Sequence, residues 1–534
     1  FLDCPTLACS AERQQAPDKT AATGVVYERL LFRHWDRWQD GARTHLFVQS
    51  LDGGAPVDVS AGLDGDVVAA PFAGAGDIVF SPDGQSIVFA ARLATHDEAW
   101  STNYDLYRAP VNASAPPVNL TAANTAMDIR PVFSPDGGTL AYLATATPGY
   151  ESDRRVIVLK DLASGATRPL TAAWDRSVDD LAFLPAGNIL IALARDTGQR
   201  ALWAISLRSG AATRLTGAGT VHGFDLVKNQ IVYSRSDLGA PADLYGTRAN
   251  GSRHRRVTAV NETALRDIAL AAFEPFSFAG WAGETVHGYV MKPARFAEGE
   301  KYPVVFLIHG GPQSSFANVW HDRWNVQALA AAGYGVVFVD FHGSTGYGQS
   351  FTDSIAGDWG GKPLEDWRRG LDAALAQFPW LDGARVCAIG GSYGGYAVNW
   401  IAGQWPDRFA CLINHAGVFD LRAMAYTTDE LWFTEHDFAG PYYAQPALYE
   451  RFNPALYVEK WQTPMLVIHG GKDFRVPATQ GLATFTALQR RGIASRLLYF
   501  PDEGHHIGQP ANALVWHRAV LDWLARWLKP DKPQ

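Results

Sequence analysis

The sequence predicts a protein of two domains, an N-terminal β-propeller and a C-terminal α/β domain built on a doubly wound, mostly parallel sheet. The first half of the chain repeats a pattern of short strands and turns, whereas the second half alternates buried apolar runs with helical stretches. A chain of 534 residues is long enough for about two or three hydrophobic cores. We therefore expect a tail or linker over residues 1–24, propeller blades over 25–268 and the α/β domain over 269–534.

The composition is that of a globular protein, with 47% hydrophobic and 19% charged residues. The formal net charge of −8 is spread without long charged runs, which argues against nucleic acid and anionic membranes as partners. The longest apolar runs, such as 304–308 and 334–339, are far shorter than the ~20 residues that span a bilayer. The sequence starts at Phe1 without a secretion signal, so we expect that an upstream segment has been removed.

The four cysteines fall into two pairs. Cys4 and Cys9 are close enough for a local disulfide, which would favour the periplasm or secretion, with the cytoplasm as the alternative. Cys387 and Cys411 lie in apolar, strand-like segments, and we expect them to be buried free thiols. The histidines lack a convergent set of metal ligands, so we expect neither a metal nor another cofactor.

The N-terminal half is a repeat. The tetrad Ser-Pro-Asp-Gly occurs at 81–84 and 134–137, each time between two strand-like runs, and a degenerate copy occurs at 184–187. Successive units end 61, 50, 45 and 42 residues apart, and periods of ~40–50 residues with several short strands are typical of propeller blades. A β-sandwich would not explain the repeat. Each unit closes with a strand, a turn and a hydroxyl residue, namely Ser60, Thr121, Thr171, Thr216 and Thr258.

The C-terminal half has the pattern of a sheet covered by helices on both faces. Buried strand-like runs alternate with helix-like stretches, and the chain closes with an amphipathic helical stretch. The strand-like runs are 304–308, 335–339, 465–468 and 496–500, and the helical stretches are 364–378, 480–491 and 513–528.

The candidate nucleophile is Ser392, in the sequence Gly390-Gly-Ser-Tyr-Gly394. The pattern G-x-S-x-G marks a sharp strand-to-helix turn in α/β-hydrolase folds, where glycines leave room for a strained backbone. With 51 glycines in the chain the pentapeptide alone could arise by chance, but an apolar strand precedes it and a buried helical pattern over 396–402 follows it.

A serine hydroxyl needs a histidine to accept its proton and a carboxylate to orient that histidine. In α/β-hydrolases these partners follow the nucleophile in the order Asp, His, on loops after later strands. Asp473 directly follows the run 465–468, and His505 follows the run 496–500. Asp502, which fits an ordinary turn aspartate, and His506 are the competing candidates.

The developing oxyanion needs fixed backbone N–H donors. The run 304–308 ends in His309-Gly-Gly-Pro312, a loop of the type that supplies one donor, which we assign to Gly311. Tyr393, the residue after the nucleophile, supplies the other.

Together with the order of the two domains, six motifs make the chain resemble the prolyl oligopeptidase family of serine peptidases, and in particular its dipeptidyl-peptidase 5 and acylaminoacyl-peptidase branch. The resemblance covers nearly the whole chain and implies that peptides are the substrates, that the histidine of the E-x-H motif is the base, and that the propeller caps the site. The motifs are His309-Gly-Gly-Pro312, Gly343-Ser-Thr-Gly-Tyr-Gly348, Gly357-Asp-Trp-Gly-Gly361, Gly390-Gly-Ser-Tyr-Gly-Gly-Tyr396, Asp473-Phe-Arg-Val-Pro477 and Glu503-Gly-His505.

The resemblance also suggests how substrates are recognised. Segments 33–38 and 97–104 are similar to segments of the dipeptidyl-peptidase 5 group, whose members must recognise a free α-ammonium group. We expect Glu98, helped by Asp97, to bind that group, and the alternative is that both are solvated loop carboxylates. The region after Asn414-His-Ala-Gly417 matches the pocket region of the family and predicts small or hydrophobic residues at P1. Val418, Leu421, Met424 and Val476, with Tyr393, would form that pocket.

Family propellers have about seven or eight blades, whereas this chain shows five unit endings, the first in an incomplete unit. We therefore expect a propeller that is incomplete at its N-terminus. The favoured activity is release of dipeptides from a free N-terminus. The alternatives are an acylaminoacyl peptidase or a related oligopeptidase or esterase, and a non-catalytic propeller protein that binds partners. The sequence also leaves a homodimer open.

Overall fold

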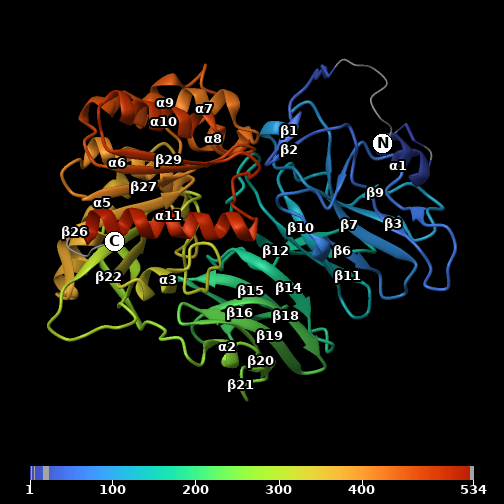
Figure 1. Cartoon of the computed structure of the whole chain (residues 1–534). Coiled ribbons are helices and arrows are strands. Elements are labelled where there is room, and N and C mark those ends of the chain that lie inside the picture. The colour runs from blue at the N-terminus through green and yellow to red at the C-terminus, as the bar shows by residue number, and fades with distance from the viewer. Residues whose placement is uncertain (2, 5, 16–22, 530–534) are drawn as a thin grey trace.

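The computed structural model describes residues 1, 3–4, 6–15 and 23–529. A region of antiparallel sheets, coloured blue to green in Figure 1, lies beside a mixed sheet flanked by helices, coloured yellow to red. In the described part of the chain, no helix combines the length and apolarity needed to cross a membrane. The N-terminal segment predicted as a tail contains helix α1 (Leu7–Gln15), which buries no residue, and residues 16–22 lie outside the described part.

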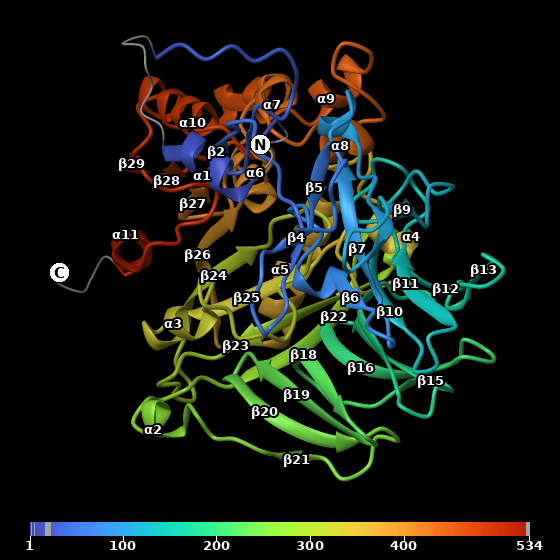
Figure 2. The ribbon, with the colours of Figure 1, turned by 90° about the vertical axis from the view of Figure 1, so that its right-hand side faces the viewer.

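Antiparallel meanders of four strands each build the N-terminal region. The described residues form four such meanders, and Figure 2 shows them following one another in chain order beside the mixed sheet. The meanders are β6 (Ile78–Phe80), β7 (Ser86–Leu93), β8 (Asp105–Pro110) and β9 (Val118–Asn119); β10 (Asp128–Phe133), β11 (Thr139–Ala144), β12 (Val156–Asp161) and β13 (Thr167–Pro169); β14 (Val178–Phe183), β15 (Ile189–Asp196), β16 (Gln199–Ser206) and β17 (Ala212–Arg214); and β18 (Thr220–Val227), β19 (Gln230–Asp237), β20 (Ala240–Arg248) and β21 (Arg255–Arg256).

Five shorter strands of the described residues precede the first meander. The third and fourth meanders are joined by a single parallel pair, Arg200 opposite Thr220, so that they count as one sheet of eight strands. Buried side chains of successive meanders, such as Val88, Leu140 and Leu190, pack into one hydrophobic cluster. The shorter strands are β1 (Arg33–His34) paired with β2 (Arg37–Trp38), β3 (Phe47–Val48) paired with β4 (Val57–Asp58), and β5 (Gly65–Val67) paired with β7.

The hydroxyl residues that close the sequence repeat share one hydrogen bond. Each side-chain oxygen accepts from a backbone N–H 14 or 15 residues earlier, at 2.9 to 3.0 Å. In the four meanders the bond ties the end of the unit to its third strand, and in the first unit it ties Ser60 to the residue before β3. Each bond pairs an N–H group that would otherwise lack a partner. The pairs are Leu46 with Ser60, Leu106 with Thr121, Ile157 with Thr171, Leu202 with Thr216, and Leu244 with Thr258.

The C-terminal sheet has eight strands in the order β22-β23-β25-β24-β26-β27-β28-β29. The first two strands pair antiparallel, and the strands from β25 to β29 are parallel, which confirms the predicted doubly wound sheet. The strands are β22 (Phe273–Ala279), β23 (Thr285–Met291), β24 (Tyr302–Ile308), β25 (Gly335–Asp340), β26 (Leu381–Gly391), β27 (Cys411–His415), β28 (Met465–Gly470) and β29 (Ser495–Phe500).

Helices cover both faces of this sheet. Side chains of α5 (Lys362–Gln377), α6 (Tyr393–Gln404) and α10 (Thr479–Arg490) belong to one buried cluster, and those of α3 (Val326–Ala331) and α11 (Pro510–Leu528) belong to another. The helical stretches predicted from the sequence coincide with parts of α5, α6, α10 and α11, and the stretches 364–378 and 480–491 each extend one residue beyond the end of their helix. The remaining helices are α2 (Glu262–Leu265), α4 (Gln349–Asp353), α7 (Leu421–Thr427), α8 (Leu431–Asp437) and α9 (Pro446–Arg451), with the short 3₁₀ segments η1 (Ala75–Asp77), η2 (Glu98–Trp100), η3 (Trp281–Gly283) and η4 (Pro454–Lys460).

The expectation that Cys387 and Cys411 are free thiols is wrong, because they form a disulfide. The two residues lie directly opposite each other on the parallel strands β26 and β27, with their Cα atoms 4.7 Å apart. Cys4 and Cys9 form the second disulfide. Nothing in the sequence pattern indicated that β26 and β27 pair in this register. The register brings the two thiols together.

Candidate active site

Ser392 occupies a sharp turn between β26 and α6. Its backbone angles are φ 59° and ψ −120°, a conformation that costs a non-glycine residue strain energy. The flanking glycines are required by space: a Cβ atom on Gly390 would lie 2.3 Å from the carbonyl oxygen of Gly394, and one on Gly394 would lie 2.2 Å from that of Ile308. The predicted strand, turn and helix are therefore present, and the turn holds the serine half-buried at the carboxyl end of the sheet.

Asp473 and His505 meet on the loops that follow β28 and β29, and His415 links this pair to the turn: its carbonyl oxygen accepts from the backbone N–H of Ser392 at 2.9 Å, and its Nε2 lies 3.3 Å from the carbonyl oxygen of His505. Nδ1 of His505 lies 2.7 Å from Oδ2 of Asp473, and both side chains are buried. Burial alone would raise the pKa of Asp473, but the charge and hydrogen bond of His505 bring it below the ordinary value. An ionised Asp473 accepts a hydrogen bond from Nδ1–H of His505, which leaves Nε2 of the neutral ring unprotonated, the form that a general base needs.

The competing candidates have other partners. Nδ1 of His506 accepts a hydrogen bond from Arg323 at 2.6 Å, and burial together with the charges of His505 and Arg323 lowers its pKa to about 4. Asp502 is exposed and accepts from the side chain of Gln509 at 2.8 Å. The geometry therefore favours the pair Asp473 and His505.

The glycine loop after β24 lies against the nucleophile. A Cβ atom on Gly310 would lie 3.2 Å from Cβ of Ser392. Gly311 has a φ of 124°, a value that glycine adopts readily and other residues rarely adopt. Tyr393 begins α6, where the first N–H groups have no partner within the helix. The predicted donors therefore lie on the two segments that flank Ser392.

His309 fixes the conformation of this loop, a role that the sequence analysis missed. Its Nδ1 donates to the carbonyl oxygen of Gly310 at 2.8 Å, so its Nε2 accepts from the hydroxyl of Ser344, also at 2.8 Å. Burial lowers the pKa of His309 to about 4, which keeps this neutral tautomer at ordinary pH. The histidine that precedes the two glycines in the motif was the available signal.

The N-terminal segment around Trp35 reaches the catalytic loops. Its backbone N–H donates to Asp429 at 2.6 Å, its indole N–H donates to Glu430 at 2.9 Å, and its carbonyl accepts from the backbone N–H of Phe474 at 2.9 Å. The indole ring also meets the ring of His505 edge-on, with the centroids 6.0 Å apart. The sequence analysis singled out this segment only by resemblance, since no local pattern indicates its contacts.

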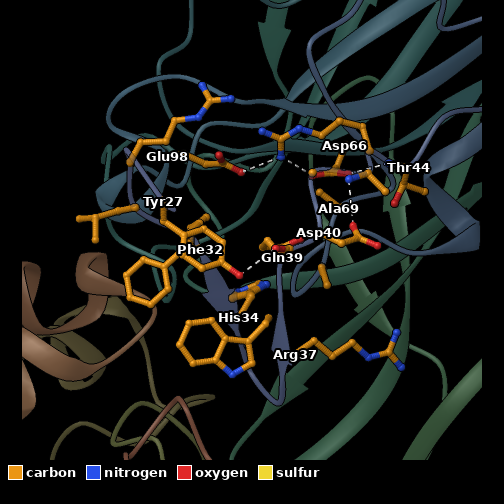
Figure 3. A pocket seen from close by; sticks show the side chains of 18 of the residues that line it. Tyr27, Phe32, His34, Arg37, Gln39, Asp40, Thr44, Asp66, Ala69 and Glu98 are labelled. Carbon is orange, nitrogen blue, oxygen red and sulfur yellow. Dashed lines mark hydrogen bonds and ion pairs between the residues drawn. The ribbon is translucent and has the colours of Figure 1, made fainter. Parts of the chain in front are cut away.

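Glu98 faces a large cavity beside the same segment. The cavity has a volume of about 1460 Å³, and residues 26–44 form much of its wall. Figure 3 shows Glu98 and Asp66 on one side of the cavity and His34 on another. Glu98 lies 3.8 Å from the guanidinium group of Arg43, and burial raises its pKa against the opposing effect of nearby arginines. Asp97 is exposed and does not line this cavity.

The residues predicted to form the P1 pocket lie in the hydrophobic core of the catalytic domain. All are at most 2% exposed and belong to one buried cluster. The hydroxyl of Tyr393 donates to the carbonyl oxygen of Trp359, so its side chain is directed into the core. Their role at P1 stays a prediction. The residues are Val418, Leu421, Met424, Val476 and Tyr393.

Comparisons with known proteins agree with this geometry. Residues 320–531 match the prolyl oligopeptidase family. The chain is 34% identical to dipeptidyl-peptidase 5 of Porphyromonas gingivalis over 521 residues, which are 96% of this chain and 76% of that protein. It is 36% identical to dipeptidyl-peptidase 5 of Schizosaccharomyces pombe over 529 residues, covering 94% of this chain and 75% of the relative. The chain belongs to the prolyl oligopeptidase family. It is therefore a serine peptidase, and a nucleophilic serine, a histidine and a carboxylate are the groups that its chemistry requires.

Solved structures of other family members share the fold. An acylaminoacyl peptidase of Pyrococcus horikoshii aligns with a TM-score of 0.74 at 22% identity, covering 86% of this chain and 71% of the other. Dipeptidyl peptidase 4 of Porphyromonas gingivalis aligns with a TM-score of 0.68 at 16% identity, covering 92% and 81%. At these identities the likeness concerns the arrangement of the chain alone.

Proposed function

We propose that this prolyl oligopeptidase family member is a dipeptidyl peptidase that releases dipeptides from the free N-terminus of oligopeptides. Ser392 is the nucleophile, His505 the general base and Asp473 the residue that orients it. The single observation that carries the chemistry is the buried 2.7 Å contact between His505 and Asp473 beside the strained turn of Ser392. The dipeptidyl specificity is supported by the relatives named dipeptidyl-peptidase 5.

The reaction follows from the positions of these groups. Nε2 of His505 takes the proton of the Ser392 hydroxyl as its oxygen attacks the carbonyl carbon of the second substrate residue. The negative oxygen of the tetrahedral intermediate accepts hydrogen bonds from the N–H groups of Gly311 and Tyr393. Protonated His505 then gives its proton to the leaving amine, and the bond to the shortened peptide breaks. A water molecule, deprotonated by His505, hydrolyses the acyl-enzyme and frees the dipeptide.

We propose Glu98 as the group that binds the substrate ammonium. A buried carboxylate at the wall of a cavity offers a strong partner to a positive charge. The cavity also contains Trp35, which contacts the catalytic loops, so the wall that carries Glu98 continues to the site of chemistry. Asp97 is the neighbouring carboxylate that does not face this cavity.

The test compares one alanine-containing peptide with a free and with an acetylated N-terminus, with products identified by mass spectrometry. The proposal expects dipeptide release from the free form alone, and Ser392→Ala is the blank. Glu98→Gln should raise KM for the free-amine peptide by about ten-fold or more, whereas Asp97→Asn, the matched control, should change it little. Release of an acetylated amino acid by the wild-type protein would instead identify an acylaminoacyl peptidase.

Two coarser features complete the proposal. The four meanders, which repeat one strand order, and the pair β3–β4, which shares their closing hydrogen bond, are proposed to be blades of a β-propeller that covers the catalytic site. A small or hydrophobic P1 residue is proposed because the segment after Gly417 is similar to the pocket region of the family and carries aliphatic side chains. Faster cleavage after proline than after alanine would contradict it.

We also propose that the protein works in an oxidising compartment, the periplasm or the outside of the cell. Both cysteine pairs form disulfides, and disulfides persist mainly in such compartments. Thiol titration of the denatured, unreduced protein isolated from its native cells should find no free thiol. Four thiols would place the protein in a reducing compartment.

A further inference from the structure

A second cavity lies where the N-terminal sheets meet the catalytic domain. Its volume is about 160 Å³. The N-terminal sheets contribute segments 151–155 and 175–179 together with Arg195, and the catalytic domain contributes Gln313, Ser314 and residues between 345 and 352. Neither the proposed chemistry nor the proposed ammonium site uses these residues.

The cavity is close to the nucleophile. A Cβ atom on Gly310 would lie 3.2 Å from Cβ of Ser392, and one on Gly311 would lie 3.0 Å from Cβ of Ser314, which lines the cavity. These two contacts, the 3.8 Å between successive Cα atoms and the two Cα–Cβ bonds together place Cβ of Ser314 no more than about 13 Å from Cβ of Ser392. An extended peptide advances ~3.3–3.6 Å per residue, so two to four substrate residues bridge this distance.

Three arginines share one carboxylate at this cavity. Asp179 is hydrogen-bonded to Arg155, accepts from Nε of Arg200 at 2.7 Å and lies 3.7 Å from Nε of Arg195. Burial would raise the pKa of Asp179, but the arginines hold it at about 2. Within this cluster one negative charge faces three positive charges, whereas the cavity lining as a whole has four arginines and four carboxylates. Two arginines of the cluster, Arg155 and Arg195, line the cavity.

Some donors at this wall are unused. Within the described part of the chain, the buried Nε of Arg155 and the buried Oγ1 of Thr345 have no hydrogen-bond partner. Both residues line the cavity. Arg195 is 43% exposed at its side chain, and its ion pair with Asp179 is longer than a hydrogen bond. An acceptor in the cavity can pair directly with the exposed guanidinium group of Arg195, and it reaches the buried Nε of Arg155 and Oγ1 of Thr345 only if those side chains turn toward the cavity. Unpaired buried donors are costly, which favours such a turn.

The acidic residues of the same cavity already have donors. Asp153 accepts from the backbone N–H groups of Ala146 and Thr147 at 2.8 and 2.7 Å, and Asp175 accepts from that of Gln349 at 3.0 Å. Glu151 accepts from the indole N–H of Trp432 at 2.8 Å and lies 3.5 Å from Arg475. A cation would therefore find these carboxylates occupied, whereas an anion would find free donors.

We propose that this cavity binds the C-terminal carboxylate of the oligopeptide substrate through Arg195, Arg155 and the Thr345 hydroxyl. The inference rests on the proposed peptidase function, since the site would bind the C-terminus of the peptide that leaves after cleavage. It implies a preference for short peptides whose free C-terminus lies two to four residues beyond the cleaved bond. A planar carboxylate suits the fork of donors that a guanidinium group presents.

The test uses peptides with one to four alanines after the cleaved bond, each made as a free acid and as a C-terminal amide. For wild-type protein, kcat/KM should favour the acid by about ten-fold or more at one length and by little at the others. Arg195→Gln should bring this ratio close to one, and Thr345→Val should reduce it in part. Arg214→Gln is the matched control, because Arg214 is also paired with an aspartate, at 3.0 Å, but does not line the cavity.

Equal rates for acid and amide at every length would overturn the carboxylate site, as would an unchanged ratio in both Arg195→Gln and Thr345→Val. A dipeptide anilide, which has no C-terminal carboxylate, separates this failure from failure of the proposed function. Wild-type protein that cleaves the anilide without distinguishing acid from amide retains the function and lacks the site. Wild-type protein that cleaves neither the anilide nor any peptide overturns both.

Discussion

The two halves of the molecule are stabilised and specialised in different ways. In the N-terminal sheets, the same closing hydrogen bond recurs from Ser60 to Thr258, so each meander repeats a local device. In the catalytic domain, Ser392, Asp473 and His505 each occur once and come from loops after three different strands. A substitution in the first region should therefore affect the stability of one sheet. A substitution in the second should affect the chemistry while leaving the fold in place.

The largest effect should follow from Ser392→Ala. Without its nucleophile the enzyme should lose about 10⁵- to 10⁶-fold in kcat, because the groups of such a triad act as one unit. The melting temperature should stay close to that of the wild type, since alanine accepts the same buried turn about as well as serine. A variant that melts far below the wild type would show that Ser392 also stabilises the fold, so that a substitution there does not affect the chemistry alone.

Asp473→Asn should come next, with a loss of about 10⁴-fold in kcat. The amide would donate to Nδ1 of His505, so Nε2 would carry the proton and could not accept one from Ser392. The measurement is the steady-state rate on a dipeptide anilide, with Asp502→Asn as the matched control. A comparable loss in Asp502→Asn would show that the assignment of the orienting carboxylate to Asp473 is wrong.

Asp340 allows a test of the catalytic domain by pH. Burial raises its pKa to about 6 in the folded protein, against the donor effects of Ser315 and Tyr347, which both lie 2.6 Å from its Oδ2. A raised folded pKa means that its contribution to stability is complete below the unfolded value of 3.8 and is lost as the pH rises through about 6.

Between pH 4 and pH 7 the free energy of unfolding of the wild type should therefore fall by about 2 kcal/mol relative to Asp340→Asn, which does not titrate. Urea unfolding of both proteins at each pH measures the difference. A difference that is independent of pH would mean that Asp340 titrates in the folded state as it does in the unfolded chain.

The sequence was sufficient to locate features that depend on local pattern and strand order. Ser392, Asp473 and His505 could be predicted to lie on loops after strands because each follows an apolar, strand-like run, and the hydroxyl residues could be predicted because their spacing repeats. The disulfide between Cys387 and Cys411 could not, since it depends on which strands are neighbours and in which register. Trp35 contacts Glu430, 395 residues away along the chain, and no local signal encodes that contact.

The smallest effect tests the repeated device itself. Thr216→Val removes the hydroxyl but keeps the side-chain shape, which leaves the buried N–H group of Leu202 unpaired and should cost about 1–3 kcal/mol of stability. Thr258→Val removes the same bond to Leu244 at an exposed position, where water can replace the hydroxyl, and should cost less than about 1 kcal/mol for that bond. It also removes the bond that the Thr258 hydroxyl donates to Asp243 at 2.8 Å, and Asp243 keeps its bonds from Arg256 and the backbone of Val260.

Chemical denaturation of the two variants compares one hydrogen bond in two surroundings. If burial sets its value, Thr216→Val shifts the unfolding midpoint more than Thr258→Val, and the rate on a dipeptide anilide stays at the wild-type level in both. Equal shifts would mean that the bond contributes through the geometry of the strand and not through burial of its donor. A large loss of activity in either variant would mean that the sheets and the catalytic loops are coupled more tightly than their separate hydrophobic clusters suggest.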